Sequence, residues 1–179
     1  SGCSYEFLRH KIHLNGGHTS EGQELQVGFC INGIRSKSFN FIKPKVGDEL
    51  ILTKPIGVGI ILAAYMRGVA SPLDYEEALN IMLTSNHFAS KVFLQNNVTS
   101  ITDVTGFGLA RHTLNLTKPF GAKINIKDIP KINGATKYLN NGIYSSLSMS
   151  NKNEINFNKN IKNENNIIFD PQTSGGLLA

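Results

Sequence analysis

Strand-like and helix-like segments alternate through the middle of this chain, and this alternation limits the fold more than any other feature of the sequence. Residues 49–53 form a short apolar segment of strand character, and an apolar-rich helical segment follows as far as about residue 67. Residues 98–102 and 122–126 again have strand character, with a helical pattern at residues 106–116 between them. The alternation predicts an α+β or mixed α/β domain, and of the two we expect an α+β fold in which a mixed sheet is flanked by helices.

Helix signals between these segments support this prediction. Ser71, followed by Pro72 and then by the acid Asp74, is typical of a helix start, with Ser as the cap and Pro in the first turn. Apolar residues then recur at helical spacing as far as Phe93, which predicts a helix that faces the core. A short helix is expected over residues 134–141.

The first forty or so residues are expected to form a separate part of the protein. Residues 11–14 and 24–31 have the pattern of strands, and a glycine-rich loop at residues 16–22 joins them. A polar stretch at residues 35–40 follows the second of these strands. We therefore expect a boundary between two units near this stretch.

A second polar stretch lies near the end of the chain. Residues 150–166 are mostly Asn, Lys and Glu, which predicts a disordered surface insertion. Residues 167–170 then have strand character and lead into a glycine turn. The chain stops at Ala179 within an apolar run, and we therefore expect it to be truncated.

Asp103 stands where a strand pattern gives way to a helical one, in the stretch ITDVTGFGLARH. A carboxylate at that place, followed by Gly106 and Gly108, lies where ligands bind in strand–helix folds. Mg²⁺ prefers one or two such carboxylates together with substrate phosphates. Thr105 could cap this helix. Alternatively, Asp103 could serve only to stabilise the start of the helix through the helix dipole. The residues by themselves leave both interpretations open.

Two glycine-rich loops are further candidates for a binding site. Gly16, Gly17, His18 and Thr19 would expose backbone N–H groups that can cradle a phosphate, although an ordinary hairpin loop has the same composition. The turn at residues 170–176 offers a carboxylate, hydroxyl groups and open backbone. Taken singly, neither loop decides its own role.

Composition excludes several classes of protein. The net charge of +5 comes from scattered lysines, so we expect no nucleic-acid partner. No apolar run approaches the ~20 residues that span a membrane, which suggests a cytoplasmic protein. Cys3 and Cys30 lack the spacing of metal ligands and are expected to be buried free thiols. The sequence contains neither a dinucleotide fingerprint nor a P-loop, and its five histidines show no zinc-site pattern.

Considered together, the motifs closely resemble those of the selenophosphate synthetases, also called selenide, water dikinases. Four motifs occur in the order of that family: GGHTSEG at 16–22, LTKPIG at 52–57, TDVTGFGL at 102–109 and DPQTSGG at 170–176. The stretch GIYSSL at 142–147, with Asn151 after it, is also similar. The resemblance covers nearly the whole chain except the Asn/Lys-rich insertion. The phenylalanine between two glycines favours this family over the related aminoimidazole ribonucleotide synthetases and thiamine-monophosphate kinases.

The resemblance implies an ATP-using enzyme that depends on Mg²⁺. Such enzymes make selenophosphate, the selenium donor of selenocysteine biosynthesis, from selenide, ATP and water, and they release AMP and phosphate. By motif match, Gly16, Gly17, His18 and Thr19 would contact the ATP phosphates, and Asp103 would be a Mg²⁺ ligand. Several cations and donors around the phosphates suit the charge of phosphoryl transfer.

The resemblance also implies a division into domains. Residues 1–43 would end an amino-terminal, ATP-binding domain, and residues 44–179 would form a truncated carboxy-terminal domain of the aminoimidazole ribonucleotide synthetase-like type. In the full-length protein, strands of the amino-terminal domain would pair with a second subunit to form a homodimer.

This sequence departs from the family pattern in two respects, since that pattern continues past Ala179 and also begins further upstream. The family's reactive cysteine or selenocysteine and its partner lysine lie upstream of the Gly-Gly-His loop, and Cys3 is too close to Gly16 to replace that nucleophile. We therefore expect the chain alone to be inactive. Two alternatives are a non-catalytic paralogue that binds nucleotide or protein, and a related synthetase that acts on a purine precursor.

Overall fold

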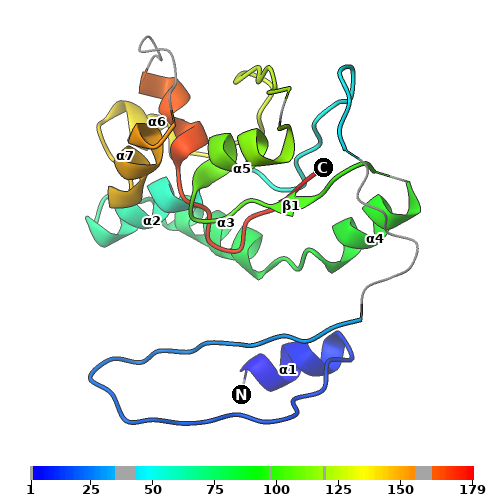
Figure 1. The fold of residues 1–179 in the computed structure, drawn as a ribbon. Helices are drawn as coiled ribbons and strands as arrows, with labels where there is room; N and C mark the ends of the chain where they lie inside the picture. Colours follow the sequence, from blue (N-terminus) through cyan, green and yellow to red (C-terminus); the bar gives the residue numbers. More distant parts are fainter. Residues whose placement is uncertain (1, 35–42, 97, 119, 156–162) are drawn as a thin grey trace. The chain divides into compact units, whose positions relative to one another are not determined.

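The computed structural model describes residues 2–34, 43–96, 98–118, 120–155 and 163–179 (Figure 1). The chain divides into two compact units, Ser1–Arg35 and Ser36–Ala179, and each is described here by itself. The boundary that we predict at residues 43–44 on the basis of the family resemblance stays a prediction.

The first unit consists of helix α1 (Gly2–Arg9) and an extended segment that follows it. The prediction of strands at residues 11–14 and 24–31 is wrong, because neither segment is paired as a strand in the described part of this unit. A strand needs a neighbouring strand to satisfy its backbone N–H and C=O groups. The apolar side chains that alternate along the second segment are therefore exposed: Leu25, Val27, Phe29 and Ile31.

Both cysteines lie in this unit and are exposed free thiols, so the predicted burial of Cys3 and Cys30 is also wrong. That prediction depended on the apolar run around Cys30. Its neighbours Phe29 and Ile31 are themselves 59% and 78% exposed, so the run forms no core in the first unit. Phe29 makes an edge-to-face contact with Phe7 of α1, with ring centroids 5.8 Å apart.

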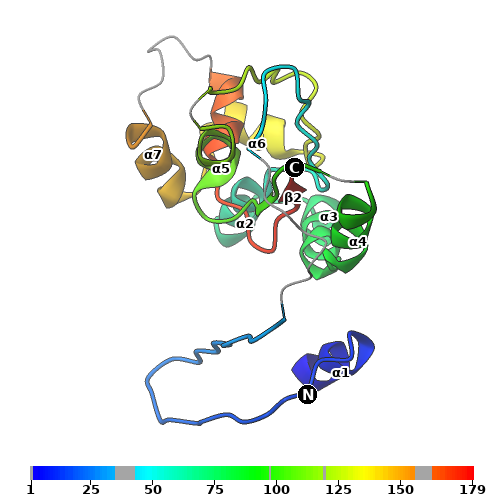
Figure 2. The same cartoon turned by 45° about the vertical axis from the view of Figure 1, so that its right-hand side comes forward.

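The second unit is mostly helical. Its elements, in chain order, are α2 (Val58–Met66), α3 (Pro72–Leu83), α4 (His87–Gln95), β1 (Thr102–Asp103), α5 (Gly108–Leu116), α6 (Ala135–Asn140), α7 (Ser146–Asn153), the 3-10 helix η1 (Asn163–Phe169) and β2 (Leu177–Leu178). Helix η1 packs against α5, α6 and α7, whereas α2 packs against α3 and α6 (Figure 2).

The sheet is smaller than the sequence predicts. Strands β1 and β2 pair antiparallel, with Asp103 opposite Leu177. Isolated bridges join Leu52 to Leu178 in antiparallel fashion and Ile56 to Lys131 in parallel fashion. In the described residues, the expected mixed sheet is therefore reduced to two short antiparallel strands with single bridges beside them.

The core of this unit gathers around α2 and η1. Helix α2 buries Val58, Gly59, Ile60, Ile61, Ala63 and Ala64, which agrees with the apolar-rich helix expected there. From η1, the side chains of Ile167, Ile168 and Phe169 are at most 1% exposed. The secondary structure of such a short apolar run is ambiguous from the sequence, because a fully buried strand and a fully buried helical turn need the same apolar residues.

Several local predictions are confirmed and others are corrected. The Ser71 hydroxyl accepts a hydrogen bond from the backbone N–H of Asp74 at 3.1 Å, so Ser71 caps α3 as predicted. The predicted long helix is interrupted between α3 and α4. No strand forms at residues 122–126, and residues 167–169 are helical rather than extended.

The prediction of disorder at residues 150–166 is wrong at both ends of that range. Residues 150–153 belong to α7 and residues 163–166 belong to η1, while residues 156–162 lie outside the described part of the chain. Asn151 is buried and donates hydrogen bonds to two backbone carbonyls. Composition does not reveal such a contact, because it depends on residues far away in the chain. Among the described residues, no helix is long and apolar enough to cross a membrane.

Candidate functional site

Asp103 lies at the end of β1, and its side chain is exposed. Residues 104–107 then connect the strand to α5, which begins at Gly108. The predicted change from strand to helix after Asp103 is therefore confirmed. Within the described residues no hydrogen bond or ion pair holds the Asp103 carboxylate, so this carboxylate is open to solvent.

The connection from Asp103 to α5 is fixed by hydrogen bonds to its backbone. The N–H of Val104 donates to the carbonyl of Gly176 at 2.9 Å, and the carbonyl of Thr105 accepts from the N–H of Gln172 at 3.1 Å. These two bonds join the loop to the turn at residues 170–176. The exposed carboxylate of Asp103 thus extends from a backbone segment that is anchored to the core.

Two side chains hold the same loop from the helices beside it. Nε2 of His112, in α5, accepts a hydrogen bond from the N–H of Thr105 at 3.1 Å. The Asn151 amide, in α7, donates to the carbonyl of Gly106 at 2.8 Å and to that of Phe169 at 3.0 Å. Sequence analysis did not single out His112. The available signal in the sequence is helical spacing, because His112 lies seven residues after Thr105, among the residues that α5 buries.

Thr105 does not cap α5 with its side chain, so the predicted cap is wrong. The N-cap position is Phe107, and it makes no side-chain cap bond. Instead, the carbonyl of Thr105 accepts from the N–H of Gly108 at 3.0 Å, and its hydroxyl lies 3.3 Å from Nε2 of His112. Thr105 therefore contributes to the loop before the helix.

The two glycines of the motif differ in their surroundings. Gly108 has φ of +74°, and a Cβ there would lie 2.8 Å from the carbonyl carbon of Phe169. The fold itself thus requires glycine at position 108. A Cβ at Gly106 would meet nothing within 4 Å, and this residue is exposed. The space around Gly106 is therefore open.

The turn at residues 170–176 uses its carboxylate inside the core. Asp170 is 1% exposed, and its Oδ2 accepts from the N–H of Gly59 at 3.0 Å and from Nε2 of Gln172 at 3.0 Å. Oε1 of Gln172 accepts from the N–H groups of Gly57 and Val58 at 3.2 and 3.3 Å. Asp170 and Gln172 together therefore satisfy N–H groups at the start of α2 that the helix leaves unpaired.

Burial raises the pKa of Asp170 to about 7, although hydrogen bonds from Gln172, Ile60 and Gly59 and the nearby Ser148 hydroxyl act in the opposite direction. The Ser148 hydroxyl acts on this carboxyl, but within the described residues neither it nor Oδ1 of Asp170 makes a hydrogen bond of standard geometry. Desolvation therefore outweighs the hydrogen bonds. The place of Asp170 beneath α2 indicates a structural role.

Lys54 joins the second half of this turn to α3. Its Nζ donates to the carbonyl of Thr84 at 2.6 Å and to that of Ser174 at 2.8 Å. Asn86 donates to the neighbouring carbonyl of Gly175 at 2.8 Å. Burial lowers the pKa of Lys54, which is 7% exposed. The lysine of the LTKPIG motif is therefore a cross-link between segments.

Gly16, Gly17, His18 and Thr19 lie in the first unit, in an extended and exposed segment. A Cβ at Gly16 or Gly17 would meet nothing within 4 Å. The described structure thus gives no reason within this unit for glycine at either position. These four residues belong to one unit and Asp103 to the other, and their roles at an ATP site stay predictions.

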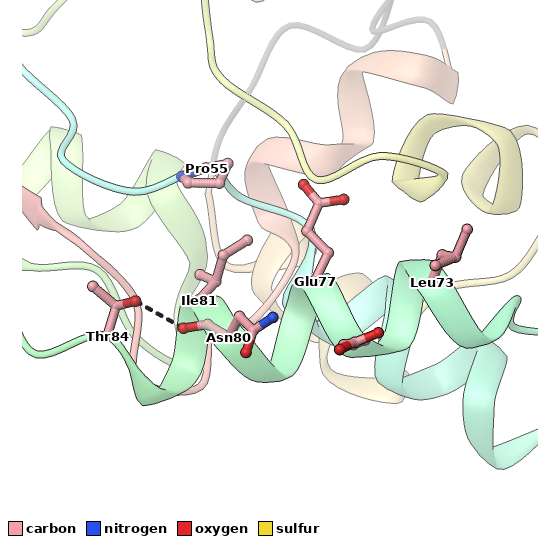
Figure 3. A pocket seen from close by; sticks show the side chains of 7 residues that line it. Pro55, Leu73, Glu77, Asn80, Ile81 and Thr84 are labelled. Carbon is pink, nitrogen blue, oxygen red and sulfur yellow. Dashed lines mark hydrogen bonds between the residues drawn. The ribbon is translucent and has the colours of Figure 1, made fainter.

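A hollow of about 440 Å³ lies along α3, and it includes none of the predicted site residues (Figure 3). Its lining consists of Pro55, Leu73, Glu76, Glu77, Asn80, Ile81 and Thr84. Figure 3 shows Leu73, Glu77 and Ile81 along one helix, with the hydroxyl of Thr84 bonded to the carbonyl of Asn80 at 2.8 Å. The hollow is open to solvent and carries two carboxylates, so it does not suit a polyphosphate.

Asp103 fits Mg²⁺ as a single ligand. Its carboxylate is exposed and therefore accessible to a hydrated metal ion. Mg²⁺ commonly uses one or two carboxylates and completes its shell with oxygens of phosphate and water. In the described part of the chain, no three His, Cys, Asp or Glu residues come together to hold a metal. In the described residues Asp103 is therefore a single candidate ligand for Mg²⁺.

Comparison with known proteins decides the family. Residues 45–152 match the family model described as AIR synthase related protein, C-terminal domain. The chain belongs to this family. Within it, the curated relatives include proteins named "Selenide, water dikinase", and the predicted resemblance to selenide, water dikinases is confirmed.

Three of these relatives show how far the similarity extends. The protein from Clostridioides difficile is 37% identical over 176 residues, and the one from Caldanaerobacter subterraneus is 37% identical over 173 residues. The protein from Carboxydothermus hydrogenoformans is 34% identical over 175 residues. Each match covers 92–93% of this chain and 50–51% of the relative. The chain thus spans about half the length of these relatives.

Proposed function

We propose that this chain works as the carboxy-terminal half of an enzyme that makes selenophosphate from selenide, ATP and water, with release of AMP and phosphate. The single observation that carries the proposal is the exposed Asp103 carboxylate on a loop anchored by His112 and Asn151. The names of the relatives, over nearly the whole of this chain, support the choice of reaction.

Asp103 would bind Mg²⁺, and the metal would neutralise phosphate charge during transfer. The chain's own contribution is to hold the exposed carboxylate at one place. Gly16, Gly17, His18 and Thr19 would bind phosphate oxygens through backbone N–H groups. Their exposure and the absence of steric demand at both glycines support that role.

We also propose the domain arrangement that this function needs. Residues 1–43 would complete an amino-terminal ATP-binding domain, and residues 44–179 would form the carboxy-terminal domain. The match of the family model to residues 45–152 supports the second assignment. The exposed apolar side chains of residues 25–31 support pairing with further strands, in the same protein or in a second subunit of a homodimer.

The test replaces Asp103 with Asn in a protein of the relatives' full length that contains this chain. Phosphorus NMR follows ATP, AMP and selenophosphate in the presence of Mg²⁺ and selenide. We expect the rate of selenophosphate formation to fall about 100-fold, because the variant loses a charged metal ligand. The control is Asp128→Asn, which changes another exposed carboxylate. Equal activity of Asp103→Asn and the control would contradict the proposed role of Asp103.

The 179-residue chain alone should make no selenophosphate and should bind ATP weakly or not detectably. It carries only part of the proposed nucleotide site, and its described residues offer no complete metal cluster. Calorimetric titration with ATP and Mg²⁺ measures this. Tight, Mg²⁺-dependent binding by the chain alone would instead support a nucleotide-binding module. Conversion of a purine precursor by the full-length protein would support the related synthetase.

A further inference from the structure

The loop after Asp103 is held by two side chains for which the proposed reaction has no chemical use. We propose that His112 and Asn151 are positioning residues, which set the place of the Asp103 carboxylate through the backbone of Thr105 and Gly106. This inference rests on the proposed function, because it assumes that Asp103 is a Mg²⁺ ligand.

The geometry assigns one tautomer to His112. The side chain is buried at 9% exposure, and its Nε2 accepts from the N–H of Thr105. A nitrogen that accepts a hydrogen bond carries no proton, so the imidazole is neutral and holds its proton on Nδ1. Burial lowers the pKa of His112 and Asp103 raises it, and the larger effect of burial favours the neutral ring.

Asn151 uses both of its amide protons. It is 7% exposed, and Nδ2 donates to the carbonyls of Gly106 and Phe169. These two carbonyls belong to segments about sixty residues apart, so one amide joins the loop, α7 and η1. A carboxylate of the same size at position 151 would bring negative charge against two carbonyl oxygens.

These contacts matter because the Asp103 carboxylate is not held in place by any hydrogen bond within the described residues. Its position depends on its own backbone, which is paired with Leu177 on one side and continues into the loop on the other. A misplacement of about 1 Å in a reacting group can reduce a rate about 100-fold. The side-chain anchors at His112 and Asn151 can be removed by substitution, whereas the backbone bonds of Val104 and Gln172 cannot.

The first test is made on the 179-residue chain by nitrogen NMR. Long-range couplings in the imidazole should show His112 with its proton on Nδ1, and the N–H of Thr105 should exchange slowly with solvent. In His112→Leu this exchange should be at least ten times faster. Thr113→Val is the matched control, since it changes a neighbouring buried hydroxyl that has no hydrogen-bond partner in the described structure. A proton on Nε2 of His112, or unchanged exchange in His112→Leu, would overturn the inference.

The second test measures the Mg²⁺ concentration for half-maximal selenophosphate formation in the full-length protein. His112→Leu and Asn151→Leu should raise it at least fivefold. His112→Gln should return this Mg²⁺ concentration to the wild-type value, because an amide oxygen can accept the hydrogen bond from the N–H of Thr105. Asn151→Asp should not return it to that value. Thr113→Val should leave it unchanged. Thermal unfolding identifies variants that do not fold. If a Leu variant does not fold, the comparison of His112→Gln with the wild type, together with the NMR result, still tests the inference.

The two hypotheses fail in different ways. If Asp103→Asn leaves the Mg²⁺ requirement unchanged, the proposed metal role is wrong. If Asp103→Asn raises the requirement but neither His112→Leu nor Asn151→Leu does, only the positioning inference is wrong.

Discussion

Two carboxylates of the motifs, Asp103 and Asp170, have opposite surroundings. Asp103 is exposed at the end of β1, whereas Asp170 is enclosed beneath the start of α2. An ionised carboxylate near a helix start is favoured by the helix dipole, but its removal from water disfavours the charge. At Asp170 the loss of water is the larger effect. The same residue type is therefore an exposed carboxylate at one position and a structural anchor at the other.

Asp170→Asn should change how stability depends on pH. The pKa of Asp170 is about 7 in the folded chain, against an ordinary value of 3.8. The folded state thus binds more protons between these values, and the stability from this group is complete below pH 3.8 and is lost as pH rises through 7. Between pH 5 and 8 the wild type should lose about 2–3 kcal/mol through this group, and Asp170→Asn should not.

Urea unfolding at pH 5 and pH 8 measures this difference. The exposed variant Asp128→Asn serves as the control, and it should follow the wild type at both pH values. An equal loss of stability in the wild type and in Asp170→Asn would show that the carboxyl does not titrate in this range.

At the scale of elements, the start of α5 depends on how closely it approaches η1. Gly108 lies against the backbone of Phe169 and has a positive φ, whereas Gly106 lies in open space. The two glycines look equivalent in the sequence. Of the two, only Gly108 is needed for the close packing of the helix, since a side chain at Gly106 would meet no neighbouring atom.

Gly108→Ala should reduce the free energy of unfolding by about 2–4 kcal/mol, through backbone strain and through overlap with Phe169. Gly106→Ala is the matched control and should change it by less than about 0.5 kcal/mol. Chemical unfolding of the second unit followed by circular dichroism provides the measurement. A similar effect of both substitutions would contradict the close approach of α5 to η1.

At the scale of the whole molecule, the two units bury apolar surface to very different extents. The second unit has a core built around α2 and η1, whereas in the first unit no described residue is buried. Apolar side chains at Leu25, Val27, Phe29 and Ile31 alternate along an unpaired segment. Such a segment gains stability only when a further strand or surface covers it.

Hydrogen exchange should reveal this difference in the 179-residue chain. Amides of residues 24–31 should exchange near the rate of an unstructured peptide, and those of α2 should exchange at least 1,000 times more slowly. Mass spectrometry after short labelling times resolves the two regions. Strong protection of residues 24–31 that increases with protein concentration would instead show that two copies of the chain pair through this segment.

The helices could be predicted largely from local signals. The Ser71 cap, the apolar-rich α2 and the change from β1 to α5 each depend on residues that are neighbours in the chain. The order of the four motifs also indicated the family, since motif order is a property of the sequence alone. Local pattern and motif order thus determined the helical framework and the relationship to selenide, water dikinases.

Tertiary structure decided the features that depend on distant partners. Residues 24–31 and 122–126 have strand patterns but form no strands, because pairing needs backbone groups from elsewhere. The burial of Asp170 and the anchoring of the Asp103 loop by His112 and Asn151 likewise depend on contacts across many residues. Periodicity counts only neighbours along the chain. Whether a carboxylate faces solvent or the core is therefore set by packing and not by the motif that contains it.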